Sequence, residues 1–196
     1  MTPDELLHKI HSGEYRLAFH GTAQLIHAFT ERGVGRGADR NSALGLFLSE
    51  IPDSAADYAQ MAYEAGEGDA ARVYVVAVPC AKAYQTTDYE RFFGVDGDHV
   101  PTRTFADFSA WRRQLLNDGY DLIEFEGVGD VINVCLAPQR AIVVACLDYE
   151  QAIELEGEGV QLFDSESIYR HLIECLPNER IMPQTPRTAP SEGLQP

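Results

Sequence analysis

The chain has 196 residues, of which 31 are acidic and 15 basic, so its formal net charge is −16 at pH 7. This length fits one domain with a tail, and the 45% share of hydrophobic residues excludes a wholly disordered chain. The charge disfavours non-specific binding to nucleic acid, which needs clustered Lys and Arg side chains. The chain has neither a run of about 18 apolar residues nor a secretory signal at its polar N-terminus. We therefore expect a cytoplasmic protein without a membrane partner.

The first third of the chain is predicted to alternate between helices and strands. Thr2 and Glu5 have the spacing of a capping box around Pro3, which predicts a helix that ends at Gly13. Further elements follow from short apolar runs bounded by glycine or proline. They are a strand at Tyr15–His20, a helix at Thr22–Arg32, a strand at Leu44–Ser49 and a helix from Pro52 to about Ala65.

The remainder of the chain is predicted to be richer in strands. The valine-rich run at Arg72–Val78 favours a buried strand, whereas the polar residues 80–103 favour an irregular insertion outside the core. Later elements are a helix between Thr104 and Gly119, strands at Tyr120–Glu126, Val131–Leu136 and Ala141–Leu147, and a helix at Asp164–Leu176. The acidic run at 154–158 is expected on the surface, and residues 181–196 are expected to form a disordered tail. This order indicates an α+β fold in one domain over residues 1–180.

A glycine-rich loop at residues 33–42 is the first candidate for ligand binding. It contains three glycines and the pair Arg36 and Arg40 in an otherwise acidic chain. No Lys-Ser or Lys-Thr follows and no helix begins directly after it, so it is not a P-loop. The arginines either contact an anionic group such as a pyrophosphate or lie in solvent.

The cysteines and histidines lack the spacing of a metal site. None of the four cysteines lies in a CxxC pair, and Cys135 and Cys146 fall in apolar runs, as buried thiols do. His8 and His11 share one helix face, but no third ligand lies nearby. We therefore expect no bound metal.

The region around His20 is the strongest candidate for chemistry. His20 ends a predicted strand, and Gly21 after it permits close approach of another backbone or of a planar ligand. Phe47 and Tyr58 belong to a strand and to the helix after it, so their rings can face each other across a slot for a flat heterocycle. The alternative is that His20 and both aromatic residues are ordinary core residues.

Four short motifs, taken in their order along the chain, resemble those of a known protein family. They are Phe19-His20-Gly21-Thr22, Gly45-Leu46-Phe47, Ser54 through Tyr58, and Gly119-Tyr120-Asp121. Together they resemble the ADP-ribosyltransferase fold in its diphtheria-toxin and poly(ADP-ribose)-polymerase branch, and more closely the transferase domains of phage-associated polyvalent proteins. The resemblance covers residues 15–147 and implies a split β-sheet with flanking helices.

The resemblance assigns roles in binding NAD as a substrate. It implies that His20 bonds a ribose hydroxyl, that the backbone at Gly21 anchors the nicotinamide amide, and that Phe47 and Tyr58 sandwich the nicotinamide ring. The predicted NAD contacts from these motifs are His20, Gly21, Thr22, Ser49, Ser54 and Tyr58. Such a site holds NAD bent and stabilises positive charge on the ribose during cleavage.

Two departures from the family pattern affect the expected reaction. Phe47 stands where the family usually has Tyr, so a hydroxyl is lost while stacking remains. The family's glutamate on a late strand falls at Val131 or Ile132 here, where no carboxylate occurs. Asp130 and Glu126 are the candidates to replace it if the strand is offset. Otherwise the site resembles members with an aliphatic residue, which transfer single units or are inactive.

Three classes of function therefore compete. The first is a bacterial or phage effector or toxin that transfers ADP-ribose from NAD to a macromolecule, with protein as the favoured acceptor, or to water as an NAD glycohydrolase. The second is an inactive module that binds NAD, ADP-ribose or a protein partner. The third is a structural protein whose motifs only build a core. Residues 80–103 and 164–176 lie outside the motifs, so we expect acceptor recognition or a partner surface there.

Overall fold

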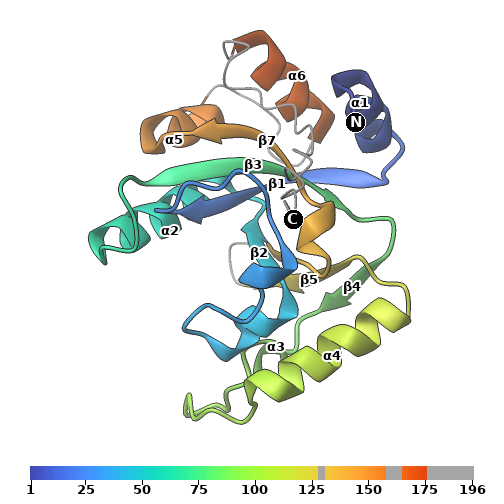
Figure 1. The fold of residues 1–196 in the computed structure, drawn as a ribbon, viewed down its shortest axis with the longest axis vertical. Helices are drawn as coiled ribbons and strands as arrows, with labels where there is room; N and C mark the ends of the chain where they lie inside the picture. The colour runs from blue at the N-terminus through green and yellow to red at the C-terminus, as the bar shows by residue number, and fades with distance from the viewer. Residues whose placement is uncertain (128–130, 158–164, 176–196) are drawn as a thin grey trace, which may run out of the picture.

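The protein is an α+β molecule built on one mixed sheet, as the computed structural model in Figure 1 shows. This confirms the predicted fold class. The structure describes residues 1–127, 131–157 and 165–175. Two sequence predictions, for Asp130 and for the tail at 181–196, concern residues outside these ranges.

Seven strands form the sheet, in the spatial order β4-β5-β6-β2-β1-β3-β7. The strands are β1 (Tyr15–Thr22), β2 (Leu46–Ser49), β3 (Arg72–Pro79), β4 (Ala83–Thr86), β5 (Leu122–Glu126), β6 (Val131–Cys135) and β7 (Ile142–Leu147). Strands β4 and β5 run parallel, and the other neighbouring pairs are antiparallel.

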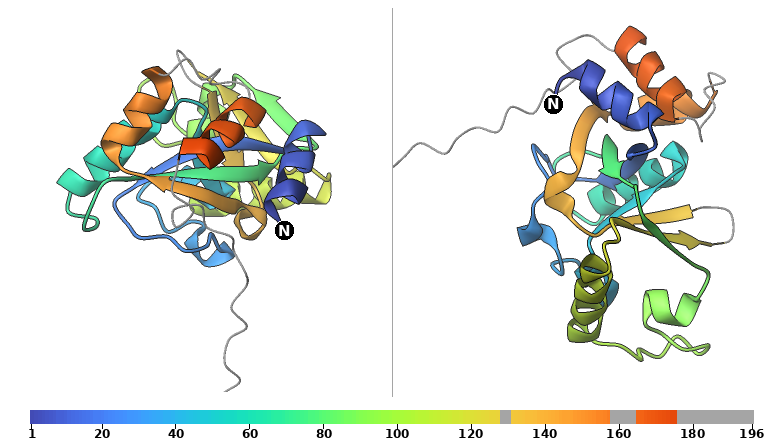
Figure 2. Two further views of the ribbon diagram at one scale, coloured as in Figure 1. Left: turned by 90° about the horizontal axis from the view of Figure 1, so that it is seen from above. Right: turned by 90° about the vertical axis from the view of Figure 1, so that its right-hand side faces the viewer.

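Helices cover the sheet in two groups. The α-helices of the described residues are α1 (Pro3–His11), α2 (Pro52–Glu64), α3 (Tyr89–Phe93), α4 (Phe105–Asn117), α5 (Tyr149–Gly157) and α6 (Ser165–Cys175). One group, α1, α2, α5 and α6, packs on β1, β3 and β7. The other group, α3 and α4 with the 3-10 turn η2 (Arg40–Leu44), packs on β5 and β6. Figure 2 shows α1 and α6 at one end of the molecule and α3 and α4 at the other.

The sheet divides where β1 meets β2. Strand β1 pairs with β3 along its whole length. On its other edge β1 is in register with β2 only at Phe19, which lies opposite Ser49. Beyond this pair the two strands separate, and the candidate site lies in the opening.

The predicted helix caps are present. The Glu5 backbone N–H donates to the Thr2 hydroxyl at 3.2 Å, and the Thr2 N–H donates to the Glu5 carboxylate at 2.7 Å. Thr104 and Asp107 form the same reciprocal pair at the start of α4. These contacts satisfy backbone donors that the first helical turn leaves unpaired. The predictions of a helix after Pro52 and of a strand from Arg72 are also confirmed.

The predicted helix at Thr22–Arg32 is wrong. These residues, all of them described, form an extended end of β1, irregular chain and a 3-10 turn η1 (Glu31–Gly33). The apolar spacing that suggested a helix has a tertiary cause. The Ile26 N–H donates to the Tyr74 hydroxyl at 2.7 Å, and Phe29 is buried against the same sheet face. The loop thus packs a partly buried Ile26 and a buried Phe29, three positions apart, on the sheet without helical backbone.

The prediction of an irregular insertion at residues 80–103 is also wrong. This segment contains β4, which adds to the sheet beside β5, and α3. The Phe92 side chain on α3 is fully buried and its ring stacks on that of Phe125, with centroids 4.4 Å apart. Elements of four and five residues are too short to show a hydrophobic period, so the polar flanks dominated the sequence pattern.

Helix α5 was not predicted. Ala152 and Leu155 are buried in the cluster that covers β1, β3 and β7, whereas Glu154 is exposed as expected. The acidic residues around these two positions masked the apolar face. Four of the five residues of the predicted acidic surface run, 154–157, therefore belong to a helix that packs on the sheet.

Candidate functional site

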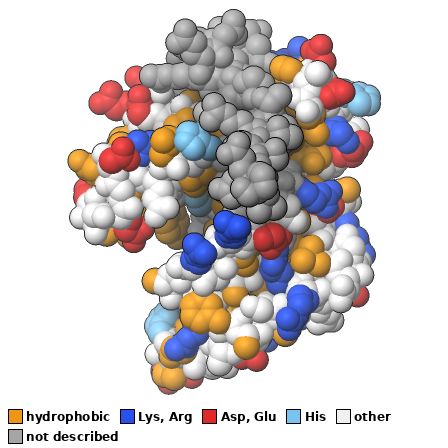
Figure 3. Space-filling view, viewed as in Figure 1, with side chains coloured by type: hydrophobic (Ala, Val, Ile, Leu, Met, Phe, Trp, Pro, Cys, Tyr) orange, Lys and Arg blue, Asp and Glu red, His pale blue; other side chains and the backbone are white. Residues whose placement is uncertain are grey.

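A cavity of about 630 Å³ opens beyond the point where β1 and β2 separate. Figure 3 shows a hollow at the left of the view, between the part that carries α2 and the part that carries α3. The volume falls within the range of about 300–1,000 Å³ that is typical of small-molecule sites. The lining consists of Phe19, His20, Gly21, Phe47, Leu48, Ser49 and Ile132 from the strands, Ala55 and Tyr58 from α2, residues 37–42, and Tyr89, Phe93, Gly94, Val95, His99 and Pro101.

His20 is held in one orientation at the edge of β1. Its Nδ1 lies 2.9 Å from the carbonyl oxygen of Phe47, and the ring of Phe29 meets its ring edge-on with centroids 5.3 Å apart. Because a carbonyl only accepts, Nδ1 carries the hydrogen and Nε2 of the neutral ring is an acceptor. Burial lowers the pKa of His20, and the bond to Phe47 opposes this shift only in part. A neutral imidazole is thus favoured in the site.

Phe47 and Tyr58 both line the cavity, as the sequence predicted that they would face one space. The Phe47 ring leans on Phe92, with centroids 5.9 Å apart, while the Tyr58 side chain on α2 is 64% exposed. Among ring contacts of the described residues, none joins Phe47 to Tyr58. The two rings therefore bound the cavity without contacting each other.

Gly21 is required by the packing of α2 on β1. A Cβ atom at this position would lie 1.8 Å from the carbonyl oxygen of Ala55 and 2.9 Å from the backbone nitrogen of Ala59. The sequence left open whether another backbone or a ligand approaches this glycine, and the structure places a helix backbone there. This close contact fixes α2, and with it Tyr58, against the strand that carries His20.

The position expected to carry a carboxylate has an aliphatic side chain. Ile132 on β6 lines the cavity, whereas Glu126 is exposed at the end of β5, opposite Val131, and does not line it. Asp130 lies outside the described residues. Among the described lining residues, Asp39 provides the single carboxylate.

The three predicted hydroxyl contacts divide in the structure. Ser49 lines the cavity, and its hydroxyl donates to the Ile51 carbonyl at 2.9 Å and accepts from the Ile51 N–H at 2.8 Å. This pair of bonds shapes the turn from β2 into α2. Thr22 and Ser54 do not line the cavity, and the Thr22 hydroxyl accepts from the Gln24 N–H at 3.2 Å.

The glycine-rich loop forms another wall of the cavity. Residues 37–42 line it, including Arg40, whereas Arg36 does not. The loop is anchored at Asn41, which is buried and donates to the carbonyl of Phe92 at 3.4 Å. One arginine of the predicted pair is therefore placed to meet a ligand.

Residues of α3 and the turn after it were missed by sequence reasoning. Tyr89 and Phe93 line the cavity with ring centroids 4.5 Å apart, and Tyr89 is 47% exposed. His99 also lines it, with a backbone φ of 60° that non-glycine residues rarely adopt. The four-residue spacing of the two aromatic residues was the available signal, because it places both on one helix face.

A charged cluster outside the cavity joins the two halves of the sheet. Arg16 on β1 pairs with Glu50, just after β2, at 2.9 Å and with Glu124 on β5. Asn133 on β6 donates to Glu50 at 3.0 Å. Burial disfavours the Arg16 charge, yet the pKa of Arg16 is raised because Glu124, Cys80 and Glu50 together outweigh burial. The cluster bridges the strands where β1 and β2 share little backbone pairing.

The remaining chemistry-bearing residues do not form a second site. Cys135 is fully buried as predicted, and burial raises its pKa to about 11. In the part of the chain that the structure describes, no three His, Cys, Asp or Glu side chains are grouped to hold a metal ion. None of the helices there combines the length and apolar character needed to cross a bilayer.

Comparison with known proteins yields only distant structural similarities. No family model matches the chain, and no curated protein matches its sequence. A solved chain from the MbcT–MbcA toxin–antitoxin complex of M. tuberculosis is 14% identical, with a TM-score of 0.45 over 80% of this chain and 100% of that one. An anti-CRISPR protein is also 14% identical, with a TM-score of 0.39 over 65% of this chain and 94% of its own. Similarities this low do not bear on what the cavity does.

Proposed function

We propose that this protein splits the bond between nicotinamide and ribose in NAD and transfers ADP-ribose to a protein acceptor. The observation that carries the proposal is that His20, Phe47 and Tyr58, from three different elements, line one cavity. These are the residues to which the sequence resemblance assigns NAD. Their convergence also counts against the view that they only build a core.

The geometry suits each part of the nicotinamide riboside. The planar nicotinamide ring lies between Phe47 and Tyr58, where stacking holds it without directional bonds. A ribose hydroxyl donates to Nε2 of His20, because the bond from Nδ1 to Phe47 leaves Nε2 as the acceptor. The lowered pKa of His20 keeps the ring neutral and so keeps this acceptor available.

Cleavage needs no proton transfer to the leaving group. The bond between C1′ of the ribose and the nicotinamide nitrogen breaks with both electrons moving to nitrogen, which neutralises the pyridinium. Positive charge then develops on the ribose, and the aromatic faces of Phe47 and Tyr58 favour a cation nearby. The acceptor's nucleophilic atom bonds to C1′ and completes the transfer.

Ile132 restricts the acceptor. A side chain without a carboxylate at this position does not orient a neutral hydroxyl or take its proton. The acceptor must then bring its own anionic nucleophile, and an Asp or Glu side chain is ionised at pH 7. Transfer to such a carboxylate forms an ester and ends after one ADP-ribose unit.

The proposal is tested by nicotinamide release from NAD, measured with purified protein alone and with a cell lysate. We expect release that increases with lysate and falls at least about 100-fold in His20→Ala, within the range for loss of one catalytic contact. His8→Ala is the matched control, because His8 is exposed on α1 and outside the cavity. Release that is unchanged in His20→Ala contradicts the proposal, and release independent of lysate assigns an NAD glycohydrolase.

An inactive NAD-binding module is the second candidate. The observation in its favour is that Ile132, one of the two residues at which the family's glutamate falls, lines the cavity, and that Asp39 is the single carboxylate among the described lining residues. This function predicts that NAD binds with an affinity that depends on Phe47 while no nicotinamide is released. Calorimetric titration of NAD alongside the release assay separates the two candidates.

A further inference from the structure

The cavity has a second aromatic wall, away from His20, that the nicotinamide end does not use. Tyr89 and Phe93 supply two rings 4.5 Å apart, and Val95 and Pro101 continue the apolar surface. Tyr89 remains 47% exposed although it contacts Phe93 and Phe125. A ring that is half free and faces a cavity is available to stack on a planar group.

This wall is rigid because the protein core holds it. The Phe92 ring stacks on Phe125 with an interplanar angle of 9°, which anchors α3 to the sheet. Gly94 ends the helix with φ 68°, and a Cβ there would lie 2.6 Å from the Phe108 ring. The wall is therefore formed in advance, which limits the entropy lost when a ligand binds.

The turn after the helix is equally constrained. Val95 and Pro101 are bridged, and the Asp96 carboxylate accepts from the Asp98 N–H at 3.0 Å and from the Val100 N–H at 2.8 Å. These bonds hold His99 in its left-handed conformation at the cavity lining. His99 adds a polar group beside the aromatic wall, as recognition of a base edge requires.

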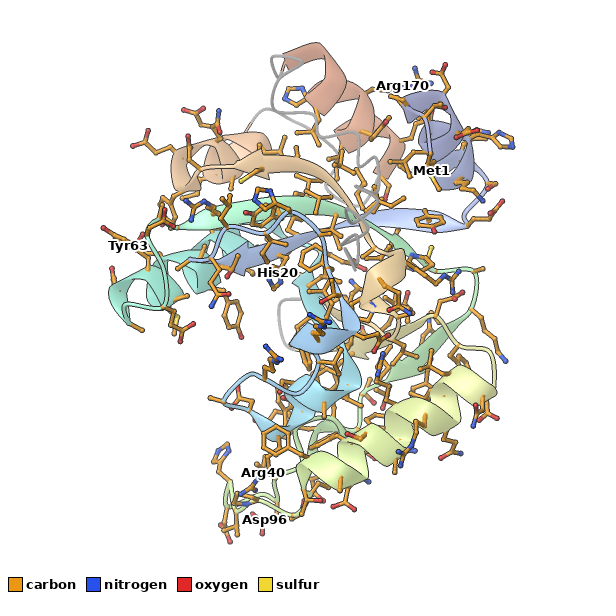
Figure 4. All side chains as sticks on the ribbon, in the orientation of Figure 1. Met1, His20, Arg40, Tyr63, Asp96 and Arg170 are labelled. Atoms are coloured by element: carbon orange, nitrogen blue, oxygen red, sulfur yellow. The ribbon has the colours of Figure 1, made fainter. Side chains whose placement is uncertain are left out.

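Arg40 supplies the fixed positive charge on the described lining and can contact an anionic link between two planar ends. Asp39 is the single carboxylate there, and the His20 ring is held neutral. In Figure 4 His20 lies on the upper side of the hollow, with Arg40 and Asp96 on the lower side. Asn41 ties the loop that carries Arg40 to Phe92 of α3, so the arginine and the second wall belong to one unit.

We propose that Tyr89 and Phe93 bind the adenine ring of NAD, with Arg40 on the pyrophosphate, so that one dinucleotide spans both walls. The proposal rests on NAD being the substrate of the first wall. A planar–anionic–planar molecule matches a lining that combines two aromatic walls with one arginine. The alternative occupant of the second wall is the acceptor protein.

The test compares ligands that contain or lack adenine. Calorimetric titrations with NAD, ADP-ribose and nicotinamide mononucleotide are made on the wild type, Tyr89→Ala, Tyr89→Phe and Tyr63→Ala. Tyr63 is the matched control, because its side chain is 46% exposed on α2 and it does not line the cavity. We expect Tyr89→Ala to weaken NAD and ADP-ribose by roughly 10- to 100-fold, the range for one base on one aromatic side chain. Nicotinamide mononucleotide is expected to bind as before, and Tyr89→Phe and Tyr63→Ala to bind all three ligands normally.

The outcomes separate this proposal from the proposed function. Unchanged ADP-ribose affinity in Tyr89→Ala overturns the adenine assignment, and if acceptor modification alone is lost the wall belongs to the acceptor. Equal weakening of nicotinamide mononucleotide and NAD also overturns it. Wild-type protein that binds ADP-ribose through Tyr89 but neither binds the mononucleotide nor releases nicotinamide supports the adenine wall and refutes the proposed reaction. Failure of the wild type to bind any of the three refutes both.

Discussion

The imidazole of His20 donates to the backbone carbonyl of Phe47 across 2.9 Å, so the side chain of one cavity residue is held by the main chain of another. The bond crosses the opening where β1 and β2 have separated, beyond their single registered pair at Phe19 and Ser49. It sets the orientation of the ring and leaves Nε2 free to accept. A change in the spacing of the two strands thus acts directly on the proposed ribose contact.

The first prediction concerns pH. The folded-state pKa of His20 is lowered from 6.5 by burial, so the unfolded chain binds more protons as the pH falls below that value. The stability that neutral His20 contributes is present above pH 6.5 and is lost as the pH falls through the lowered pKa. His20→Asn keeps a donor for the Phe47 carbonyl but does not titrate. Urea unfolding between pH 7.5 and 5.5 is expected to show a smaller loss of stability in His20→Asn than in the wild type, whereas equal losses contradict the prediction.

The second prediction concerns the contact between α2 and β1. Gly21→Ala places a Cβ at 1.8 Å from the Ala55 carbonyl oxygen, and two backbone segments have to move apart. We expect a loss of about 3 kcal/mol in the free energy of unfolding, at the upper end for overpacking. Gly33→Ala is the control, because nothing lies within 4 Å of its added Cβ, and its effect is expected to stay within about 0.5 kcal/mol. Similar unfolding midpoints for the two variants in urea would show that α2 is not held in this way.

The third prediction concerns the charged cluster at the start of β1. Arg16→Met leaves Glu50 and Glu124 without their shared cation, and we expect a loss of about 2 kcal/mol, below the range for fully buried pairs because the Arg16 side chain is 30% exposed. Adding Glu50→Gln and Glu124→Gln to that variant is expected to restore part of the loss. Arg170→Met serves as the control, because it removes an exposed ion pair with Glu166, one turn earlier on the same helix. Thermal unfolding of the four proteins is the measurement, and no recovery in the triple variant would exclude charge repulsion as the cause.

The fourth prediction concerns the aliphatic position on β6. Ile132→Glu introduces a carboxylate into the cavity lining, where it stabilises positive charge on the ribose. We expect nicotinamide release without an acceptor to rise by about 10-fold. Val131→Glu is the control, since adjacent strand residues point to opposite faces. An equal or smaller rate in Ile132→Glu, with binding of NAD retained, would mean that this position does not adjoin the reacting bond.

The sequence predicted elements whose signals are local. The capping box of Thr2 and Glu5 is read from residues three positions apart, and it has a clear physical cause in the structure. The proximity of His20, Phe47 and Tyr58 was expected from a histidine at a strand end, from aromatic residues on a strand and the helix after it, and from the order of the motifs; all three line the cavity. Such signals survive without knowledge of the strand order.

Features that depend on distant partners were not predictable. Ile26 and Phe29 pack on the sheet because of Tyr74 and the sheet face it belongs to, so their spacing led to the wrong prediction of a helix. Phe92 is buried because Phe125, 33 positions later, stacks on it. Tyr89 and Phe93 line the cavity for the same reason, because the packing of α3 on β5 fixes where α3 lies. The part of the cavity lining that α3 supplies could therefore not be predicted from the sequence.

The order in which the lining residues occur along the chain has a consequence for synthesis. His20 and Phe47 come early, but Ile132 comes from β6, the strand that pairs with β2 along its far edge. A nascent chain that has emerged only as far as β5 still lacks Ile132 and therefore part of the cavity lining. Because domains form as their last contributing segments leave the ribosome, the site is assembled only after β6 (Val131–Cys135) has emerged. Shorter ribosome-bound products carry His20, Phe47 and Tyr58 without the complete pocket.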